Sequence, residues 1–458
     1  MKVIILGAGQ VGYSIARYLA FEENDITIVD HSADLLKRIS DKLDVQPVVG
    51  FASHPDVLKQ AGAEEADLLI AVTASDEVNM IACEAAQSLF QVETKIARIR
   101  HQSYLKPAWS NMFSPDRLAI DVIISPEIEV ARALDRSTQI PGAFEVIPLV
   151  LNQIKVIGVR CHAQSPIINT PLRLLPGLFS SLDIVIVCIS REDKAFFPDE
   201  NSVLEVNDEV HFIVKHDDIS QAMEAFGYYG SDSRRMVIIG GGSIGKTLAM
   251  EIELNQPDIV AKLIEKDQGR SEVAARLLKN IEVLHGDALD YEVLAEANVQ
   301  NAETVVAVTD DDKVNILSSL LAKRCGAGRA LTLLNNLTYS SLVTSLGVDA
   351  VINPRAITVS TILQHVRQAR LRSVHTLGDN YAEVIEAEAR ETSHIIGLTV
   401  DDVTIKGSVM IAAVVRNNQV ILLPKKLIIS VGDRLVIIAK KETVRKIEKL
   451  FSIRPSYL

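Results

Sequence analysis

Short runs of Val, Ile and Leu alternate along the chain with longer segments whose apolar residues recur at helical spacing. In the first third of the chain, these runs occupy 2–7, 25–30, 45–50, 66–73, 94–100 and 121–125. A short run without polar alternation predicts a strand that is covered on both faces, as in a parallel sheet. Strands that alternate with helices predict βαβ units, so we expect an α/β fold with a doubly wound parallel sheet. Six strands fit a complete Rossmann sheet.

The same pattern is written a second time. Comparable runs occupy 235–240, 259–266, 281–286, 304–309, 330–335 and 349–353. KVIILGAGQVGYSIARYLA in the first copy matches RMVIIGGGSIGKTLAMEIE in the second, and the match continues in order. Asp30 corresponds to Glu265, and further along Asn79 corresponds to Asn315. An offset that stays between 233 and 236 residues over this length predicts a duplicated domain.

Each copy ends in a helix that opens with a capping residue and Pro, at Ser125-Pro126 and Asn353-Pro354. Each helix is followed by alternating strands and turns, such as NDEVHFIV at 207–214 and GDRLVIIA at 432–439. The predicted organisation is two Rossmann-like domains at 1–140 and 232–370, two small related α+β appendages at 141–226 and 371–458, and a linker at 227–235.

Residues 237–248, VIIGGGSIGKTL, fit two phosphate-binding patterns. GGGSIGKT at 240–247 fits a P-loop, which holds ATP and magnesium, and its first six residues fit the dinucleotide fingerprint GxGxxG. The first copy has GAGQVG at 7–12 followed by Tyr13, so it has the fingerprint but lacks the P-loop lysine. We therefore favour the dinucleotide pattern in both copies, with Lys246 as a solvated residue of the helix. A Gly-rich turn in an empty Rossmann fold is the alternative.

Both fingerprints follow a strand, precede a helix and are followed by an acid at the end of the second strand. Asp30 lies 18 residues after Gly12, and Glu265 lies 20 residues after Gly245. A Rossmann domain places its ribose-binding carboxylate there. The glycines permit a tight turn, close approach of backbone N–H groups to phosphates, and close helix packing, while the helix N-terminus attracts the anion. The sequence therefore predicts two non-covalent nucleotide sites.

Further candidate residues lie at the carboxyl ends of other strands, which meet at the same edge of the sheet. Thr73 and Thr309 end the fourth strands. Ser75-Asp76-Glu77 in the first copy and Asp310-Asp311-Asp312 in the second then begin a helix, where ligand contact and an ordinary helix-start role are both open. Asp287, after the third strand of the second copy, is a candidate acceptor for an adenine amino group. The first copy has Phe51 instead.

The fifth strand distinguishes the two copies. The first has IARIR, with Arg98 and Arg100 two residues apart and therefore on one side of the strand. Arginine suits phosphate oxygens by its charge and fork geometry. The second copy has ALTLLNN, and we match Thr332 and Leu334 to the two arginines. We expect the first site to take a more anionic ligand such as ATP, and the second to prefer NAD. Structural ion pairs are the alternative role for the arginines.

Composition restricts the class of protein. The chain has 458 residues, too many for one ordinary core, and its net charge of −12 argues against a general nucleic-acid binder. Its four cysteines lack metal-ligand spacing, so we expect buried free thiols and no metal site. There is no signal-peptide pattern, and no apolar run approaches the ~20 residues of a membrane span. We expect a cytosolic protein that reaches a membrane only through a partner.

No catalytic apparatus accompanies the cofactor fingerprints. The histidines do not recur between the copies in a common role, and no nucleophile elbow, zinc-protease motif or carboxylate pair stands out, so we predict no catalytic residues. Tandem cofactor domains without catalysis suggest a sensor, whose ligands shift a conformational equilibrium. An NAD-dependent oxidoreductase is the alternative.

Several stretches carry a family resemblance: GAGQVG, DITIVD, GFASHPDVL with GDALDYEVL, AVTASDEVNMIA and IARIR. Together with the two appendages they resemble the TrkA family, whose members contain two tandem RCK (regulator of potassium conductance) units. The resemblance implies RCK-C-like appendages and units that pair through crossover helices, here 125–138 and 353–373. It also implies a cytosolic homo-oligomeric ring, usually a tetramer, beneath a membrane-embedded Trk potassium channel subunit. In such a ring NAD, NADH, ATP or ADP bias channel opening.

The resemblance also assigns two cofactor-binding sites, residue by residue. The first comprises Gly7, Ala8, Gly9, Gln10, Val11, Asp30, Thr73, Ala74, Arg98 and Arg100. The second comprises Gly240, Gly241, Gly242, Ser243, Ile244, Glu265, Asp287, Thr309 and Asp310. Phe51 leaves adenine recognition in the first site open, and the missing arginines leave triphosphate binding in the second open. We predict a non-enzymatic, nucleotide-gated regulatory subunit of a potassium transporter; a regulator of another cation transporter is a further alternative.

Overall fold

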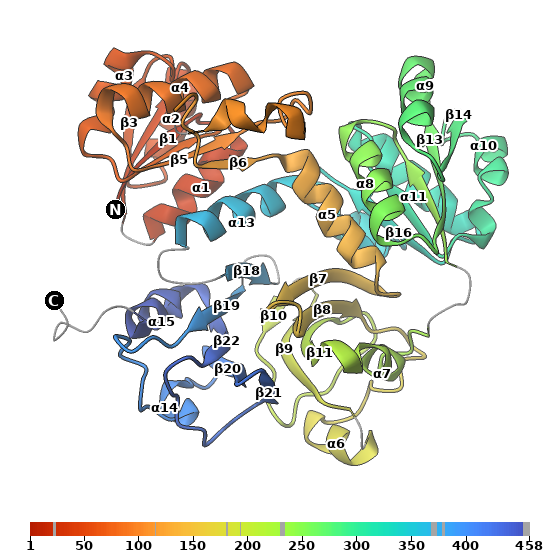
Figure 1. The fold of residues 1–458 in the computed structure, drawn as a ribbon. Helices are drawn as coiled ribbons and strands as arrows, with labels where there is room; N and C mark the ends of the chain where they lie inside the picture. Colours follow the sequence, from red (N-terminus) through yellow and green to blue (C-terminus); the bar gives the residue numbers. More distant parts are fainter. Residues whose placement is uncertain are drawn as a thin grey trace. The chain divides into compact units, whose positions relative to one another are not determined.

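The computed structural model describes residues 1–21, 24–114, 116–179, 182–192, 194–229, 234–367, 373–377 and 381–451. The chain forms two compact units. One comprises Met1–Val130 with Pro354–His365, and the other comprises Ala131–Asn353 with Val366–Leu458. Figure 1 shows two parallel sheets flanked by helices and two antiparallel sheets.

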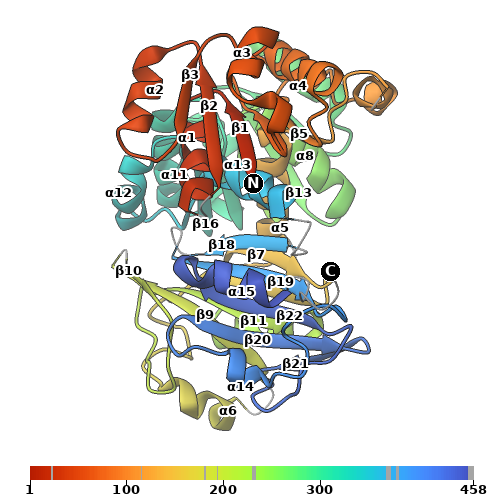
Figure 2. The same ribbon diagram turned by 90° about the vertical axis from the view of Figure 1, so that its left-hand side faces the viewer.

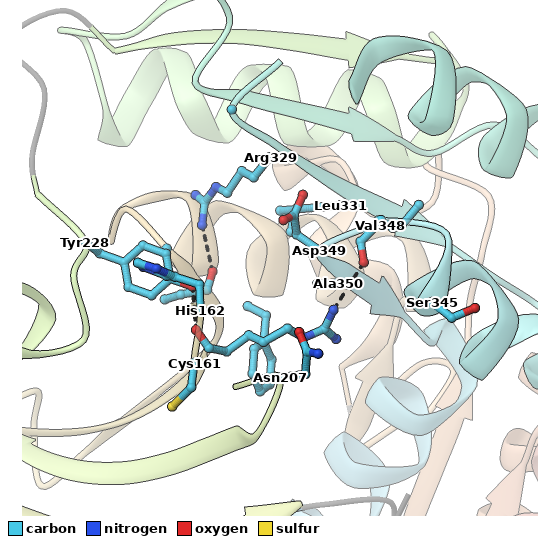
Figure 3. Close-up of a pocket in the computed structure, with 16 residues that line it drawn as sticks. Cys161, His162, Asn207, Tyr228, Arg329, Leu331, Ser345, Val348, Asp349 and Ala350 are labelled. Atoms are coloured by element: carbon cyan, nitrogen blue, oxygen red, sulfur yellow. Dashed lines mark hydrogen bonds between the residues drawn. The ribbon is translucent and has the colours of Figure 1, made fainter. Parts of the chain in front are cut away.

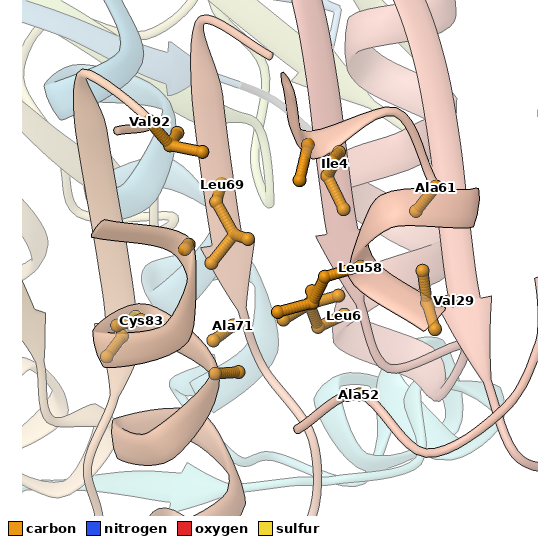
Figure 4. Close-up of a cluster of buried hydrophobic side chains, with 14 of the residues drawn as sticks. Ile4, Leu6, Val29, Ala52, Leu58, Ala61, Leu69, Ala71, Cys83 and Val92 are labelled. Carbon is orange, nitrogen blue, oxygen red and sulfur yellow. The ribbon is translucent and has the colours of Figure 1, made fainter. Parts of the chain in front are cut away.

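A six-stranded parallel sheet forms the first Rossmann domain. Its strands are β1 (Lys2–Leu6), β2 (Asp25–Asp30), β3 (Gln46–Val49), β4 (Leu68–Ala71), β5 (Thr94–Arg98) and β6 (Val122–Ile124), in the order β3-β2-β1-β4-β5-β6. Its helices are α1 (Gln10–Phe21), α2 (Ala33–Ser40), α3 (Pro55–Gln60) and α4 (Asp76–Phe90). Leu6 and Leu69 from the sheet, Leu58 from α3 and Cys83 from α4 belong to one buried apolar cluster (Figure 4). The strand order reverses between β1 and β4, which opens a crevice at the carboxyl ends of these strands.

The second Rossmann domain repeats this arrangement. Its strands are β12 (Arg235–Ile239), β13 (Val260–Glu265), β14 (Glu282–His285), β15 (Thr304–Ala307), β16 (Arg329–Leu333) and β17 (Ala350–Ile352), in the order β14-β13-β12-β15-β16-β17. Its helices are α8 (Ser243–Asn255), α9 (Gln268–Leu277), α10 (Tyr291–Glu296), α11 (Asp312–Cys325) and α12 (Ser340–Ser345). The identical strand order confirms the predicted pair of doubly wound parallel sheets.

Each appendage contains a five-stranded antiparallel sheet. The first has β7 (Ala143–Leu149), β8 (Ile154–Arg160), β9 (Ile184–Arg191), β10 (Lys194–Phe196) and β11 (Glu209–Lys215), with helices α6 (Leu175–Leu178) and α7 (Ile219–Ala225). The second has β18 (Ser373–Leu377), β19 (Ala382–Glu388), β20 (Val409–Arg416), β21 (Gln419–Leu422) and β22 (Arg434–Lys440), with α14 (Val400–Val403) and α15 (Val444–Phe451). The orders β7-β8-β11-β9-β10 and β18-β19-β22-β20-β21 are equivalent, so the appendages are also copies of one another.

The two appendage sheets share one apolar core. Val156 and Ile213 of the first appendage belong to the same buried cluster as Val384 and Val436 of the second. Figure 2 shows the strands of the two appendages beside one another. Strands of these sheets are apolar on the face that turns away from their own helices, and that face needs a second sheet to exclude water. The first appendage also extends beyond its predicted end, because Tyr228 packs against its core.

Two helices follow the Rossmann sheets, α5 (Pro126–Thr138) and α13 (Pro354–Arg367). Residues Pro354–His365 of α13 belong to the compact unit of the first Rossmann domain, whereas α5 from Ala131 onward belongs to the unit of the second. The buried carboxylate of Asp135 in α5 accepts hydrogen bonds from Gln256, at 2.7 Å, and Asn255, at 3.0 Å, at the end of α8. Most of each crossover helix is thus grouped with the compact unit that contains the Rossmann domain of the other half. Of the predicted second crossover helix, 353–373, residues 368–372 are not among the described residues, and Ser373 begins β18.

Candidate functional site

Glycines fix the turn between the first strand and the first helix of each Rossmann domain. Gly7 has φ 108° and Gly240 has φ 106°, a left-handed conformation that favours glycine. A Cβ on Gly12 would lie 1.9 Å from the carbonyl oxygen of Gly7, and one on Gly245 would lie 1.8 Å from that of Gly240. The first and third glycines of each fingerprint are therefore required by the backbone itself.

The middle glycine of each fingerprint faces open space instead. A Cβ on Gly9 or Gly242 would meet no atom within 4 Å. The helices begin immediately afterwards, α1 at Gln10 and α8 at Ser243, and the backbone N–H groups of a first helical turn have no acceptor within the helix. Space and free donors occur together at this point in both copies, so the loops fit the phosphates of a nucleotide.

The acid at the end of the second strand braces the glycine loop. Asp30 accepts hydrogen bonds from the backbone N–H of Ala8, at 2.7 Å, and of Ser32, at 2.8 Å. Glu265 accepts equivalent bonds from Gly241, at 2.6 Å, and Asp267, at 2.8 Å. The sequence predicted only a ribose contact for these acids. Each carboxylate oxygen can accept more than one bond, so the brace leaves acceptor capacity for a ribose hydroxyl.

A buried asparagine organises the end of the fourth strand in each copy. The Oδ1 atom of Asn79 accepts from the backbone N–H of Thr73, at 2.9 Å, and from its hydroxyl, at 2.7 Å. Asn315 holds Thr309 in the same way, at 2.8 and 2.6 Å. From the sequence alone these asparagines marked the offset of the repeat, and their structural role was not predicted. Their recurrence as polar residues on the buried side of a helix is the signal that could have revealed it.

The acidic helix starts have structural roles, with one exception. Ser75 and Asp311 cap α4 and α11 through their side chains. Asp76 accepts from the backbone N–H groups of Arg100 and His101. Asp312 accepts from those of Asn335 and Asn336, at 2.9 Å each. Asp310 remains exposed at the carboxyl edge of the sheet.

Both predicted arginines lie at the carboxyl edge of the first sheet. Arg98 donates from Nη2 to the carbonyl oxygen of Thr73, at 2.7 Å, and Arg100 donates to that of Ala74. Burial lowers the pKa of the Arg98 guanidinium, and the neighbouring Arg100 lowers it further. Burial raises the pKa of Glu127, the nearby carboxyl group at the start of α5. Among the described residues, the Arg98 Nε atom is buried without a hydrogen-bond partner. A donor in this state fits an anion that approaches the crevice.

The strand register corrects the match of the second copy. Because Ala97 and Thr332 occupy equivalent places beside the fourth strands, the match of the arginines to Thr332 and Leu334 is wrong by one residue. The corresponding pairs are Ala97 with Thr332, Arg98 with Leu333, and Arg100 with Asn335. The sequence match failed because the offset between the copies shortens by one residue just before this strand. The second crevice still lacks both positive charges.

The outer ends of the crevices, beside the second and third strands, differ between the copies. In the second copy Asp287 pairs with Lys266, with 2.8 Å between Nζ and Oδ2, and the pair lowers the pKa of Asp287. In the first copy the rings of His31 and Phe51 stack, with centroids 5.8 Å apart and planes inclined by 10°.

The described part of the chain contains no cluster of side chains suited to bind a metal ion. No group of three or more His, Cys, Asp or Glu side chains there is arranged to hold a metal ion. Lys246 lies in the first turn of α8 and is half-buried. Cys83, Cys161 and Cys188 are buried and free, and Cys325 is half-buried and free.

A separate cavity of about 450 Å³ lies between the first appendage and the amino ends of β16 and β17 (Figure 3). Arg329, which is buried there, donates to the carbonyl oxygen of Ala143, at 2.9 Å, and to the hydroxyl of Thr304, at 2.7 Å. Burial lowers the pKa of Arg329 to about 10. Because the glycine loop lies at the opposite edge of the sheet, this cavity belongs to the junction between the two domains.

Comparison with known proteins places the chain in a family. The TrkA-N domain model matches residues 3–126 and 236–354, and the TrkA-C domain model matches 156–227 and 384–452. The Trk system potassium uptake protein TrkA of Azorhizobium caulinodans is 44% identical over 453 residues, which cover 99% of each chain. The chain belongs to the TrkA family.

Solved structures agree with the tandem organisation of this TrkA-family chain. The GsuK RCK domain has a TM-score of 0.60 at 17% identity and covers 98% of this chain and 94% of its own. The GsuK channel bound to NAD has a TM-score of 0.60 at 15% identity, covering 98% of this chain and 78% of that one. At these identities the likeness establishes the RCK fold. No helix in the described ranges is long and apolar enough to cross a membrane.

Proposed function

We propose that this TrkA-family chain is a nucleotide-binding regulatory subunit of a Trk-type potassium uptake system. NAD(H), ATP or ADP would bind in the two crevices and bias the opening of a membrane-embedded potassium channel subunit. The observation that carries the proposal is the duplicated crevice. In each copy the glycine loop has open space at its middle glycine, is held by an acid at the end of the second strand, and precedes a helix whose first N–H groups have no acceptor within the helix. The GsuK channel, a structure with the same fold, is bound to NAD.

The two sites are proposed to be unequal. The first crevice has Arg98 and Arg100 where the second has Leu333 and Asn335, so the first favours the more anionic ATP or ADP. The second, without these charges, favours NAD or NADH. Both sites act by binding, because a ligand shifts a conformational equilibrium by its difference in affinity for the two states.

Calorimetric titration of the full chain with NADH and then with ATP, with NADH absorbance followed in parallel, tests binding against catalysis. We expect saturable binding at two sites per chain, competition by ATP at one, and no loss of NADH. Steady NADH oxidation in the presence of a substrate would favour the alternative, an NAD-dependent oxidoreductase.

The partner is tested separately. The protein is proposed to form a homo-oligomeric ring of four chains. The channel subunit would hold this ring at the inner face of the cell membrane. Co-purification with a Trk-type membrane subunit, and nucleotide-dependent potassium flux in vesicles that contain both proteins, are the expected results. Co-purification with an antiporter instead would assign the chain to another cation transporter.

A further inference from the structure

The two crevices present different chemistry where a purine base would lie. The base of a nucleotide extends from the ribose toward the neighbouring third strand, beyond the acid that ends the second. In the second copy this place holds Lys266 and Asp287, an ion pair with 2.8 Å between Nζ and Oδ2. In the first copy the equivalent residues are His31 and Phe51, whose rings are stacked. We call Lys266 and Asp287 the charged wall of the second crevice, and His31 and Phe51 the aromatic wall of the first. The two copies therefore allow the two kinds of wall to be compared within one chain.

The aromatic wall is held in position although it faces solvent. Phe51 is 59% exposed, and its ring also lies against His54, with 5.3 Å between the centroids. The Nδ1 atom of His31 lies 3.2 Å from Oδ1 of Asp30, the acid that braces the glycine loop. A Cβ on Gly50 would lie 2.6 Å from a methyl group of Val57, so the backbone before Phe51 is packed tightly on α3. An exposed ring fixed beside a binding crevice is a ready surface for another ring.

We propose that the first crevice recognises a purine by stacking on Phe51, beside His31, and therefore accepts adenine and guanine nucleotides alike. Stacking engages the face of a base, which adenine and guanine share, and it is tolerant of the base for that reason. In the second crevice the Asp287 carboxylate can accept a hydrogen bond from the amino group of adenine. Guanine has a carbonyl oxygen at that position, which cannot donate to the carboxylate and is repelled by it, so adenine is preferred. This inference rests on the proposed nucleotide binding and adds the base specificity of each site.

The test needs two variants of the full chain, in each of which one crevice is blocked so that binding to the other is measured alone. Gly242→Glu places a carboxylate where the phosphates would bind in the second crevice, and Gly9→Glu does so in the first. Both positions leave room, since a Cβ there would meet no atom within 4 Å. Unchanged melting temperatures would verify that the two blocked chains are folded.

In the Gly242→Glu chain, calorimetry with ATP, GTP and CTP measures the first crevice. We expect ATP and GTP to bind within about threefold of each other and CTP, with its smaller ring, more weakly. Phe51→Leu, which keeps an apolar side chain but no ring, should weaken ATP and GTP by a common factor of about tenfold. Phe51→Trp should retain affinity, and its emission should be quenched by either purine. Phe51→Asp should lower GTP affinity more than ATP affinity.

The matched control is the second crevice in the Gly9→Glu chain. There ATP should bind more tightly than GTP, and Asp287→Ala should reduce that preference. A preference of the first crevice for ATP of more than about thirtyfold would overturn the proposal, as would Phe51→Leu without effect on either purine. Failure of the unaltered chain to bind any nucleotide would instead reject the proposed function itself, together with this inference.

Discussion

The glycines of the two fingerprints have different roles, and the packing around each one shows which role it has. Gly12 and Gly245 are needed for the close approach of helix to strand, whereas Gly9 and Gly242 face open space. The same residue type therefore serves stability at one position and ligand access at another. The acids Asp30 and Glu265 also have two roles, because they hold the glycine loop and are the predicted acceptors for the ribose of a ligand.

Gly12→Ala should destabilise the first Rossmann domain by about 1–3 kcal/mol or more, because its Cβ would meet the Gly7 carbonyl oxygen at 1.9 Å. Gly9→Ala is the matched control and should leave the melting temperature nearly unchanged. Thermal unfolding of the two variants checks this. Equal stability of both would mean that the helix shifts to accommodate the methyl group.

Arg98→Leu combined with Arg100→Asn gives the first crevice the residues of the second. ATP affinity at that site should fall by about 10- to 100-fold, since two charged donors are lost, while NADH affinity changes little. The fold should tolerate the change, because Leu333 and Asn335 already occupy these places in the second copy. Calorimetry with both ligands measures the effect. An unchanged ATP affinity would leave the arginines a purely structural role.

Equivalent strands of the two appendages carry buried ionisable residues of opposite type, one basic and one acidic. Lys155 in β8 and Glu383 in β19 occupy the same place in their sheets, opposite Val214 and Ala439. Burial lowers the pKa of Lys155 and raises the pKa of Glu383 to about 8. The appendages share a topology, yet they respond differently to pH.

Glu383 should make the protein less stable as pH rises from about 5 to 8. In this window the folded state keeps the Glu383 proton and the unfolded state has lost it, so stability falls by about 1.4 kcal/mol per pH unit and is level above the folded pKa. Glu383→Gln should remove this slope, as urea unfolding from pH 5 to 9 would measure. Lys155→Met is the control and should leave the slope between pH 5 and 8 unaltered. An identical slope in Glu383→Gln would contradict the raised pKa.

The halves of the chain are joined by more than the linker at 227–235. The compact unit that starts at Ala131 contains the first appendage together with most of the second half, and the appendages share a buried core. A shared apolar core holds together segments that are far apart in the sequence, because separating them would expose apolar side chains to water.

A protease site introduced at 230–233 should therefore cut the chain without separating the halves. We expect the two fragments to elute together in gel filtration. Val436→Asp, which places a charge in the shared core, should release them, whereas Leu151→Asp, at an exposed position, should not. Separation of the unsubstituted fragments at micromolar concentration would contradict a stable shared core.

The sequence contained the features that local physics dictates. The duplicated Rossmann fold could be predicted from apolar runs of strand length, the repeat from Gly7 to Asn315, and the spacing of glycines to Asp30 and Glu265. The same features nominated the candidate site residues, whose contacts with a ligand stay predictions. These features are readable because strand burial, helix periodicity and glycine sterics act over a few neighbouring residues.

Tertiary structure decided the features that depend on distant segments. The one-residue correction from Leu334 to Asn335 came from strand pairing, and the role of Asn79 came from its burial between two strand ends. The stacked His31 and Phe51, the grouping of α13 with the first Rossmann domain and the core shared by the appendages likewise join residues far apart in the chain. Such contacts leave no periodic trace in the sequence, because each partner satisfies its own local pattern and their meeting is fixed only when the sheets pack.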